Sequence, residues 1–155
     1  MRLEYFHLID RVDAVDREAG TLRASAQVPT HSTIFEGHFP GYPILPGVLL
    51  IESMAQAGGN LILVLEDFAR MPFLAQVEQA KLRRFVEPGT QLTVSASLVH
   101  LGSGYAVTRG RVESASGTVA EAEIRFRTLP FPSEETRQLM FDHARRLGLQ
   151  PPMRA

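Results

Sequence analysis

Residues 44–65 read ILPGVLLIESMAQAGGNLILVL, and the rest of the fold is predicted from this segment outward. Glu52 is its only charged residue, so a helix formed here is apolar on almost every side. The length also suits a membrane span. We expect a buried core helix instead, because the stretch carries Glu52, Gln56 and Asn60, and polar groups at membrane depth are costly.

Segments of alternating hydrophobicity surround this helix, which is expected to end near Asp67. In residues 91–99 and 119–127 apolar residues alternate with polar ones, as in antiparallel strands with one buried face. Three further strands are expected at Leu8–Asp16, Leu22–Val28 and Phe73–Arg84. About six strands and one long helix predict an α+β domain, in which a twisted antiparallel sheet wraps around the helix.

The composition is that of one globular domain spanning residues 1–155, with 45% hydrophobic and 21% charged residues. Its core is expected at about residues 6–128, followed by a helical extension at about 133–148 with Ser133 as its N-cap. The tail, residues 150–155, is expected to be mobile.

The absence of cysteine excludes disulfides, thiolate metal sites and a cysteine nucleophile. A net charge of −1 argues against nucleic acid as the main partner. The N-terminal residues lack the apolar run of a signal peptide, so we expect a soluble cytoplasmic protein. Residues 81–127 hold 7 basic and 4 acidic residues, which is either a basic face for an acidic partner or a solvated strand face.

The first candidate for chemistry is Glu52. On a helix, Glu52, Gln56 and Asn60 are spaced i, i+4, i+8 and form one polar stripe. A carboxylate among apolar side chains must be paired, or its equilibrium shifts toward the protonated form. A neutral buried acid suits general-acid catalysis at neutral pH. The alternative is a structural carboxylate bonded to backbone groups, and position alone does not separate the two.

The second candidate is His38, in a long loop expected over Thr30–Leu45. The sequence around it, Gly37-His38-Phe39-Pro40-Gly41, combines prolines that restrict the backbone with glycines that permit close approach. Long loops are often functional, and a histidine held in one can act as a general base near neutral pH. The alternative is a surface or packing histidine.

The third candidate is the start of the long helix, Pro46-Gly47-Val48, with Pro46 in the first turn. The first amides of a helix are unpaired and carry partial positive charge, so they can hold a carbonyl oxygen that gains negative charge. The alternative is a plain helix start. No pair of histidines has the H-E-x-x-H spacing, so no zinc site is expected.

Together these features carry a family resemblance. Residues 37–57, GHFPGYPILPGVLLIESMAQA, closely resemble the signature GHFPG-x-P-x-x-PGV-x-x-x-E-x-MAQ of FabZ-type (3R)-3-hydroxyacyl-[acyl-carrier-protein] dehydratases. Residues 81–89, KLRRFVEPG, resemble the family's basic segment, and residues 8–12, LIDRV, its first strand. The likeness runs through about residues 6–128.

The resemblance implies a hotdog fold, paired as homodimers and often assembled as hexamers of three dimers. It implies that His38 and Glu52 are the catalytic pair, contributed by opposite protomers. It assigns the Gly47 amide to the thioester carbonyl, with Val48 beside it, and Gln56 to holding the glutamate. The implied reaction removes water from a 3-hydroxyacyl thioester, which changes no oxidation state, so no metal or other cofactor is expected.

The implied partner is an acidic acyl carrier protein. Its expected docking residues are Lys81, Arg83 and Arg84. FabA-type dehydratase/isomerases carry Asp at the position of Glu52 and Cys at that of Val48, so this chain resembles the dehydratase-only group.

Three alternatives stay open at this point. The segment at residues 81–86 departs from the family's RFKRPV, and the C-terminal extension is not a typical feature. The first departure leaves the preferred acyl chain length open, and the whole chain also resembles dehydratases dedicated to very-long-chain or lipid A acyl groups. The other two alternatives are a hotdog acyl thioesterase and a non-catalytic module that binds the acyl carrier protein.

Overall fold

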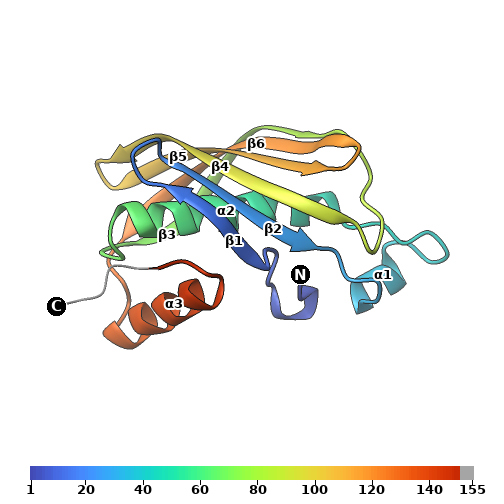
Figure 1. The fold of residues 1–155 in the computed structure, drawn as a ribbon, viewed down its shortest axis with the longest axis horizontal. Helices are drawn as coiled ribbons and strands as arrows, with labels where there is room; N and C mark the ends of the chain where they lie inside the picture. The colour runs from blue at the N-terminus through green and yellow to red at the C-terminus, as the bar shows by residue number, and fades with distance from the viewer. Residues whose placement is uncertain (151–155) are drawn as a thin grey trace.

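The computed structural model of the protein describes residues 1–150 and contains one six-stranded antiparallel sheet that arches over a long helix, α2 (Figure 1). The strand order is β1-β2-β4-β5-β6-β3. The strands are β1 (Arg11–Asp16), β2 (Thr21–Gln27), β3 (Met71–Leu82), β4 (Gln91–Gly102), β5 (Tyr105–Ser114) and β6 (Gly117–Leu129). The helices are a 3-10 turn (Leu3–Tyr5), α1 (Thr33–Gly37), α2 (Gly47–Leu65) and α3 (Glu134–Arg146). This is the hotdog architecture that the sequence predicts.

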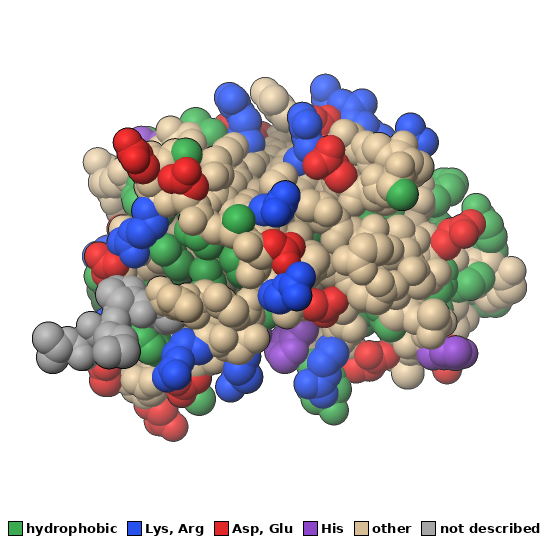
Figure 2. All heavy atoms as spheres, in the orientation of Figure 1, with side chains coloured by type: hydrophobic (Ala, Val, Ile, Leu, Met, Phe, Trp, Pro, Cys, Tyr) green, Lys and Arg blue, Asp and Glu red, His purple; other side chains and the backbone are tan. Residues whose placement is uncertain are grey.

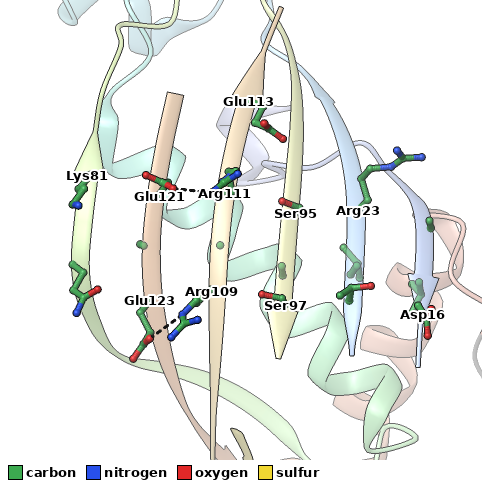
Figure 3. A pocket seen from close by; sticks show the side chains of 18 residues that line it. Asp16, Arg23, Lys81, Ser95, Ser97, Arg109, Arg111, Glu113, Glu121 and Glu123 are labelled. Carbon is green, nitrogen blue, oxygen red and sulfur yellow. Dashed lines mark hydrogen bonds and ion pairs between the residues drawn. The ribbon is translucent and has the colours of Figure 1, made fainter. Parts of the chain in front are cut away.

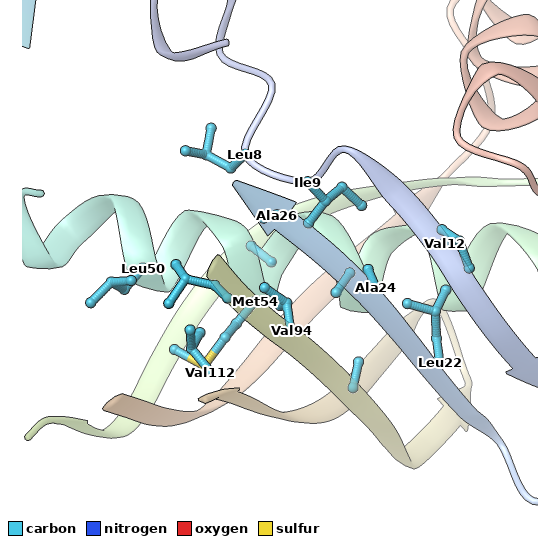
Figure 4. Close-up of a cluster of buried hydrophobic side chains, with 14 of the residues drawn as sticks. Leu8, Ile9, Val12, Leu22, Ala24, Ala26, Leu50, Met54, Val94 and Val112 are labelled. Carbon is cyan, nitrogen blue, oxygen red and sulfur yellow. The ribbon is translucent and has the colours of Figure 1, made fainter. Parts of the chain in front are cut away.

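The core lies between α2 and the inner face of the sheet. Leu50 and Met54 of α2 are 2% and 0% exposed, and they lie close to Val94 of β4 and Val112 of β5 (Figure 4). Burying one such side chain contributes about 1.5–3 kcal/mol. α2 is long and apolar enough to cross a membrane, but 61% of its most apolar 18-residue window is buried inside the molecule, as in a core helix.

Small residues let the sheet approach α2 closely. A Cβ on Gly110 of β5 would lie 2.6 Å from the Cβ of Met54. A Cβ on Gly58 of α2 would lie 2.6 Å from Oγ1 of Thr108. At each of these two points the backbone of a glycine packs directly against a side chain of the other layer, so a larger residue does not fit there.

The alternation predicted for the later strands is confirmed. The side chains of β4 at Leu92, Val94 and Ala96 are all buried. In β6 the four apolar residues that share a face are buried too: Ala120, Ala122, Ile124 and Phe126. The edge strand β3 differs, since most of it is exposed on both faces and its pairing with β6 slips at two places.

Three sequence-based boundaries are wrong. β1 begins at Arg11 and not at Leu8, because Asp10 turns its carboxylate to the N-terminal amine and to the backbone N–H of Gln27. The loop at residues 30–45 contains the short helix α1, whose N-cap Ser32 accepts a hydrogen bond from the Ile34 N–H. α2 ends at Leu65, before the two residues at positions 67 and 68, which have positive φ.

The predicted C-terminal helix is present as α3, on the side of α2 that faces away from the sheet (Figure 1). Ser133 caps it as predicted, by accepting a hydrogen bond from the Thr136 N–H at 3.1 Å. Arg137 Nε donates to the carbonyl of Phe68 at 2.7 Å, which ties α3 to the segment after α2. The mobility expected for residues 150–155 stays a prediction, because all of them except Gln150 lie outside the described part.

Candidate active site

His38 lies in the loop between α1 and α2, half-buried, with its ring stacked on Phe39 at 4.1 Å between centroids. Its Nδ1 is 2.8 Å from the carbonyl oxygen of Ile44, and the Ile44 N–H donates back to the His38 carbonyl at 3.0 Å. A carbonyl only accepts, so Nδ1 carries the hydrogen in this contact. Nε2 of the neutral ring is then left with a free lone pair, which is the form that a general base needs.

Glu52 lies on α2 and is hydrogen-bonded to Gln56 one turn later, the contact that the family resemblance implies. Gln56 Nε2 donates to Glu52 Oε1 at 3.1 Å. The same amide group donates to the carbonyl of Phe6 at 2.8 Å, while Gln56 Oε1 accepts from the Leu8 N–H at 3.0 Å. These backbone contacts fix the orientation of the amide, and with it the position of the carboxylate.

The segment before β1 therefore belongs to the site, a role that the sequence analysis missed. Its contacts with Gln56 are made through backbone atoms of Phe6 and Leu8. Any residue type can make such backbone hydrogen bonds, so the sequence contains no signal for them. Asn60 continues the predicted stripe by donating to the Gln56 carbonyl at 2.9 Å, while its buried Oδ1 has no hydrogen-bond partner.

The start of α2 is closely packed on one side and open on the other. Pro46 is the N-cap, and Gly47 and Val48 are the first helical residues, whose N–H groups have no hydrogen-bond acceptor within the helix. A Cβ on Gly47 would lie 2.4 Å from Cδ1 of Leu82, so glycine permits this contact with β3. Val48 is 68% exposed, which leaves the helix start accessible to a ligand.

A cavity of about 390 Å³ adjoins Glu52 and Gln56. Most of its remaining wall is apolar, with Ala55, Gly59 and Leu63 of α2 on one side. The other strands and helices contribute Pro72, Leu74, Phe126 and Met140, and the polar members are His7, Asn60 and His143. His38 of the same chain is not among the lining residues.

A larger hollow of about 620 Å³ lies on the outer face of the sheet and is polar (Figure 3). Arg109 and Arg111 of β5 reach Glu123 and Glu121 of β6 there, at 3.5 and 3.0 Å. Of the predicted site residues only Lys81 lines it. The opposite charges neutralise each other across the strands, and none of the predicted catalytic residues is present, so the chemistry belongs to the smaller cavity.

The basic docking residues are only partly free. Arg83 donates from Nε and Nη2 to Glu121 at 2.8 and 2.6 Å, and these bonds lower the pKa of that carboxyl. Lys81 and Arg84 are exposed. Figure 2 shows Lys and Arg side chains along the upper rim of one face, with Asp and Glu among them. Among residues 1–150, no three His, Asp or Glu side chains are grouped to hold a metal ion.

Comparison with known proteins identifies the family of the chain. Residues 2–123 match the model of the FabA-like domain. A 3-hydroxyacyl-[acyl-carrier-protein] dehydratase FabZ from Pelotomaculum thermopropionicum is 41% identical over 125 residues, which cover 78% of this chain and 86% of the relative. The FabZ of Chlamydia pneumoniae is 42% identical over 126 residues, covering 78% and 81%.

Solved structures share the fold at low identity. A hypothetical thioesterase from Streptococcus pneumoniae, solved with coenzyme A, aligns with a TM-score of 0.63 at 15% identity, over 84% of this chain and 99% of that one. A mutant thioesterase from Pseudomonas aeruginosa aligns with a TM-score of 0.61 at 21% identity, over 78% and 81%. These two likenesses establish the hotdog fold alone. The sequence relatives establish more: this chain belongs to the FabA-like family, among its FabZ-type 3-hydroxyacyl-[acyl-carrier-protein] dehydratases.

Proposed function

We propose that the protein removes water from a (3R)-3-hydroxyacyl thioester on acyl carrier protein and releases the trans-2-enoyl thioester, as a step of fatty acid biosynthesis in the cytoplasm. The observation that carries the proposal is the pairing of Glu52 with Gln56 at the edge of an apolar-walled cavity. A carboxyl group held in this way is placed to act on a hydroxyl group, while the apolar wall suits an acyl chain.

His38 Nε2 takes the proton from C2 of the substrate. Negative charge then builds on the thioester oxygen and is met by the N–H of Gly47 at the open start of α2. Glu52 gives its proton to the C3 hydroxyl group, which departs as water while the C2–C3 double bond forms. Gln56 keeps Glu52 in place, and Val48 lies beside the thioester. The elimination balances with one proton taken and one given.

In this proposal each complete site forms only in a dimer, with His38 from one protomer and Glu52 from its partner. Two observations support it. The cavity beside Glu52 lacks His38 of the same chain. Strand β3 has a free edge and exposes Phe73, Leu74 and Val77, a surface that a second copy can cover by pairing strand with strand.

The carrier protein is proposed to dock near the end of β3. Lys81 and Arg84 are exposed there, whereas Arg83 is already paired with Glu121. An acidic carrier is attracted to the free cations first, because binding Arg83 would require its ion pair to exchange. Lys81 and Arg84 are therefore the main docking residues in this proposal, and Arg83 contributes less.

One assay tests the reaction. The purified protein is given 3-hydroxydecanoyl-acyl carrier protein, and enoyl product and free carrier thiol are followed together. Enoyl product without free thiol is the expected result. Free thiol without enoyl product would show a thioesterase, and binding without turnover would show a carrier-binding module; either outcome overturns the proposal. The Glu52→Gln variant serves as the matched control, because it keeps the size of the side chain and removes the acid.

A further inference from the structure

Helix α3 lies outside the part of the chain that matches the family model, which ends at residue 123. Two of its side chains, Met140 and His143, nevertheless line the cavity that holds Glu52. They are three residues apart, so they share one face of the helix. The cavity wall is therefore built partly from a helix that the family domain does not supply.

α3 is held firmly in this position. Arg137 Nε donates to the Phe68 carbonyl at 2.7 Å, and the rings of Phe141 and Phe68 meet edge to face at 5.2 Å between centroids. After the helix, the Val12 N–H donates to the Leu147 carbonyl at 2.7 Å. With anchors at its start, middle and end, α3 forms a fixed wall.

The shape of the cavity suggests what lies against this wall. Along α2 the lining residues run from Glu52 to Leu63, a distance of about 16 Å at 1.5 Å per residue. Two of the lining residues beyond Glu52 on that path, Ala55 and Gly59, are small and leave room beside the helix. Gln56 and Asn60 are its polar members, and Met140 adds a flexible apolar side chain from α3. An extended chain leaving the reacting carbon atoms at Glu52 would run between α2 and α3.

His143 suits an apolar occupant. Its burial, with His7 and Arg146 close by, lowers its pKa below the ordinary value of 6.5. The ring is therefore neutral near pH 7 and presents no charge to the cavity. Its centroid is 5.2 Å from that of His7, so the two rings lie together at the rim between α3 and the N-terminal segment.

We infer that α3 forms one wall of the acyl-binding part of the cavity, and that Met140 determines which acyl chain lengths fit. The inference rests on the proposed dehydration, since it concerns the remote part of the same substrate. Arg137 and Phe141, which flank Met140 in α3, both contact Phe68 just beyond the end of α2, so Met140 lies toward the Leu63 end of the cavity and meets only chains long enough to reach it. Its size therefore changes the preference between long and short substrates.

The test uses the full-length protein and three carrier-protein thioesters, 3-hydroxybutyryl, 3-hydroxydecanoyl and 3-hydroxypalmitoyl. The kcat/KM of dehydration is measured for Met140→Ala, Met140→Trp and the wild type. We expect the palmitoyl-to-butyryl ratio to rise at least about tenfold in Met140→Ala and to fall by a similar factor in Met140→Trp, the range typical for a change in pocket size. Leu139→Ala is the matched control, because Leu139 is the neighbouring α3 residue and is 61% exposed.

Unchanged ratios in both Met140 variants, with the wild type active, would overturn the role of α3 and leave the proposed dehydration intact. A wild type that dehydrates none of the three thioesters would overturn the proposed function and this inference with it. Circular dichroism shows whether Met140→Ala folds. If it does not, the palmitoyl-to-butyryl ratio is judged from Met140→Trp, in which it should fall, with the volume-conserving Met140→Leu as the reference. Equal ratio shifts in Leu139→Ala would also count against Met140.

Discussion

The hydrogen bond from His38 Nδ1 to the Ile44 carbonyl determines which ring nitrogen can act as a base, and the bond from Gln56 determines where Glu52 lies. We therefore expect His38→Ala and Glu52→Gln each to lower kcat by at least about 10²-fold, as loss of an acid–base group typically does. Steady-state dehydration kinetics measure the effect.

His31→Ala is the matched control for the histidine. His31 is exposed in the same stretch of chain, and its Nδ1 lies 3.1 Å from the hydroxyl oxygen of the neighbouring Thr30. Its activity should stay at the wild-type level. Near-normal kcat in His38→Ala or in Glu52→Gln would show that the roles are assigned to the wrong residues.

A second residue-scale prediction concerns Glu66, the C-cap of α2. Burial raises its pKa above 4.5 against the opposing pull of Arg70, and its Oε2 has no hydrogen-bond partner. The folded state thus binds this proton more tightly than the unfolded state, so stability falls as pH rises through the folded-state pKa. Glu66→Gln should therefore have a higher Tm than the wild type near pH 7, and the difference should shrink below pH 4.5.

Glu121→Gln is the control of opposite sign. Hydrogen bonds from Arg83 hold the pKa of Glu121 below its ordinary value, so its contribution is present at neutral pH and lost on acidification. The Tm of this variant should lie at or below that of the wild type near pH 7. A Glu66→Gln protein less stable than the wild type at neutral pH would contradict the prediction.

At the scale of elements, the approach of β5 to α2 depends on Gly110. A Cβ there would meet Met54 at 2.6 Å, and Met54 is fully buried. Gly110→Ala should lower the free energy of unfolding by about 1–3 kcal/mol, the usual cost of overpacking a core. Urea denaturation measures it.

Gly37→Ala is the comparison for the Gly110 variant. Gly37 ends α1, and no atom lies within 4 Å of its would-be Cβ. Equal stability losses in the two variants would show that backbone freedom, and not contact with Met54, makes Gly110 important.

Elements with a regular pattern could be predicted from the sequence, and others could not. The alternation in β4 and β6 and the apolar run of α2 specify which face is buried, so these elements were predicted closely. Leu8 and Ile9 are as buried as strand residues, but the Leu8 N–H donates to Gln56 and the Asp10 carboxylate accepts from the Gln27 N–H, so the strand begins only after them. α1 has only five residues, too short for any periodicity.

At the scale of the molecule, the sequence proposes site residues only where one motif carries them. His38, Gly47 and Glu52 lie within a continuous stretch of the chain, and the resemblance identified them together. The contributions of Phe6 and Met140 come from both ends of the chain and depend on tertiary packing. No local pattern reports such contacts, which explains why the wall of the cavity was missed.

The shared site gives a prediction for the whole assembly. His38→Ala and Glu52→Gln are each expected to be inactive, but a mixed dimer contains one site with both native residues. Mixing equal amounts and allowing subunits to exchange should restore about a quarter of wild-type activity, because half the dimers are mixed and each has one intact site.

Exchange is followed independently with two affinity tags, one on each variant. Two copies of the same variant, tagged and mixed in the same way, serve as the control and should stay inactive. Mixed dimers that form without recovered activity would show that His38 and Glu52 act within a single protomer.

Helix α2 also bears on how this protein is made. The strands that cover most of it, β3 to β6, lie at residues 71–129, after the helix in the chain. Because synthesis proceeds from the N-terminus, the nascent chain exposes a complete apolar helix while only β1 and β2 have left the ribosome. During that interval the helix is open to chaperones, to aggregation and to capture by a bilayer. The rate at which residues 71–129 are translated therefore determines how long α2 stays exposed.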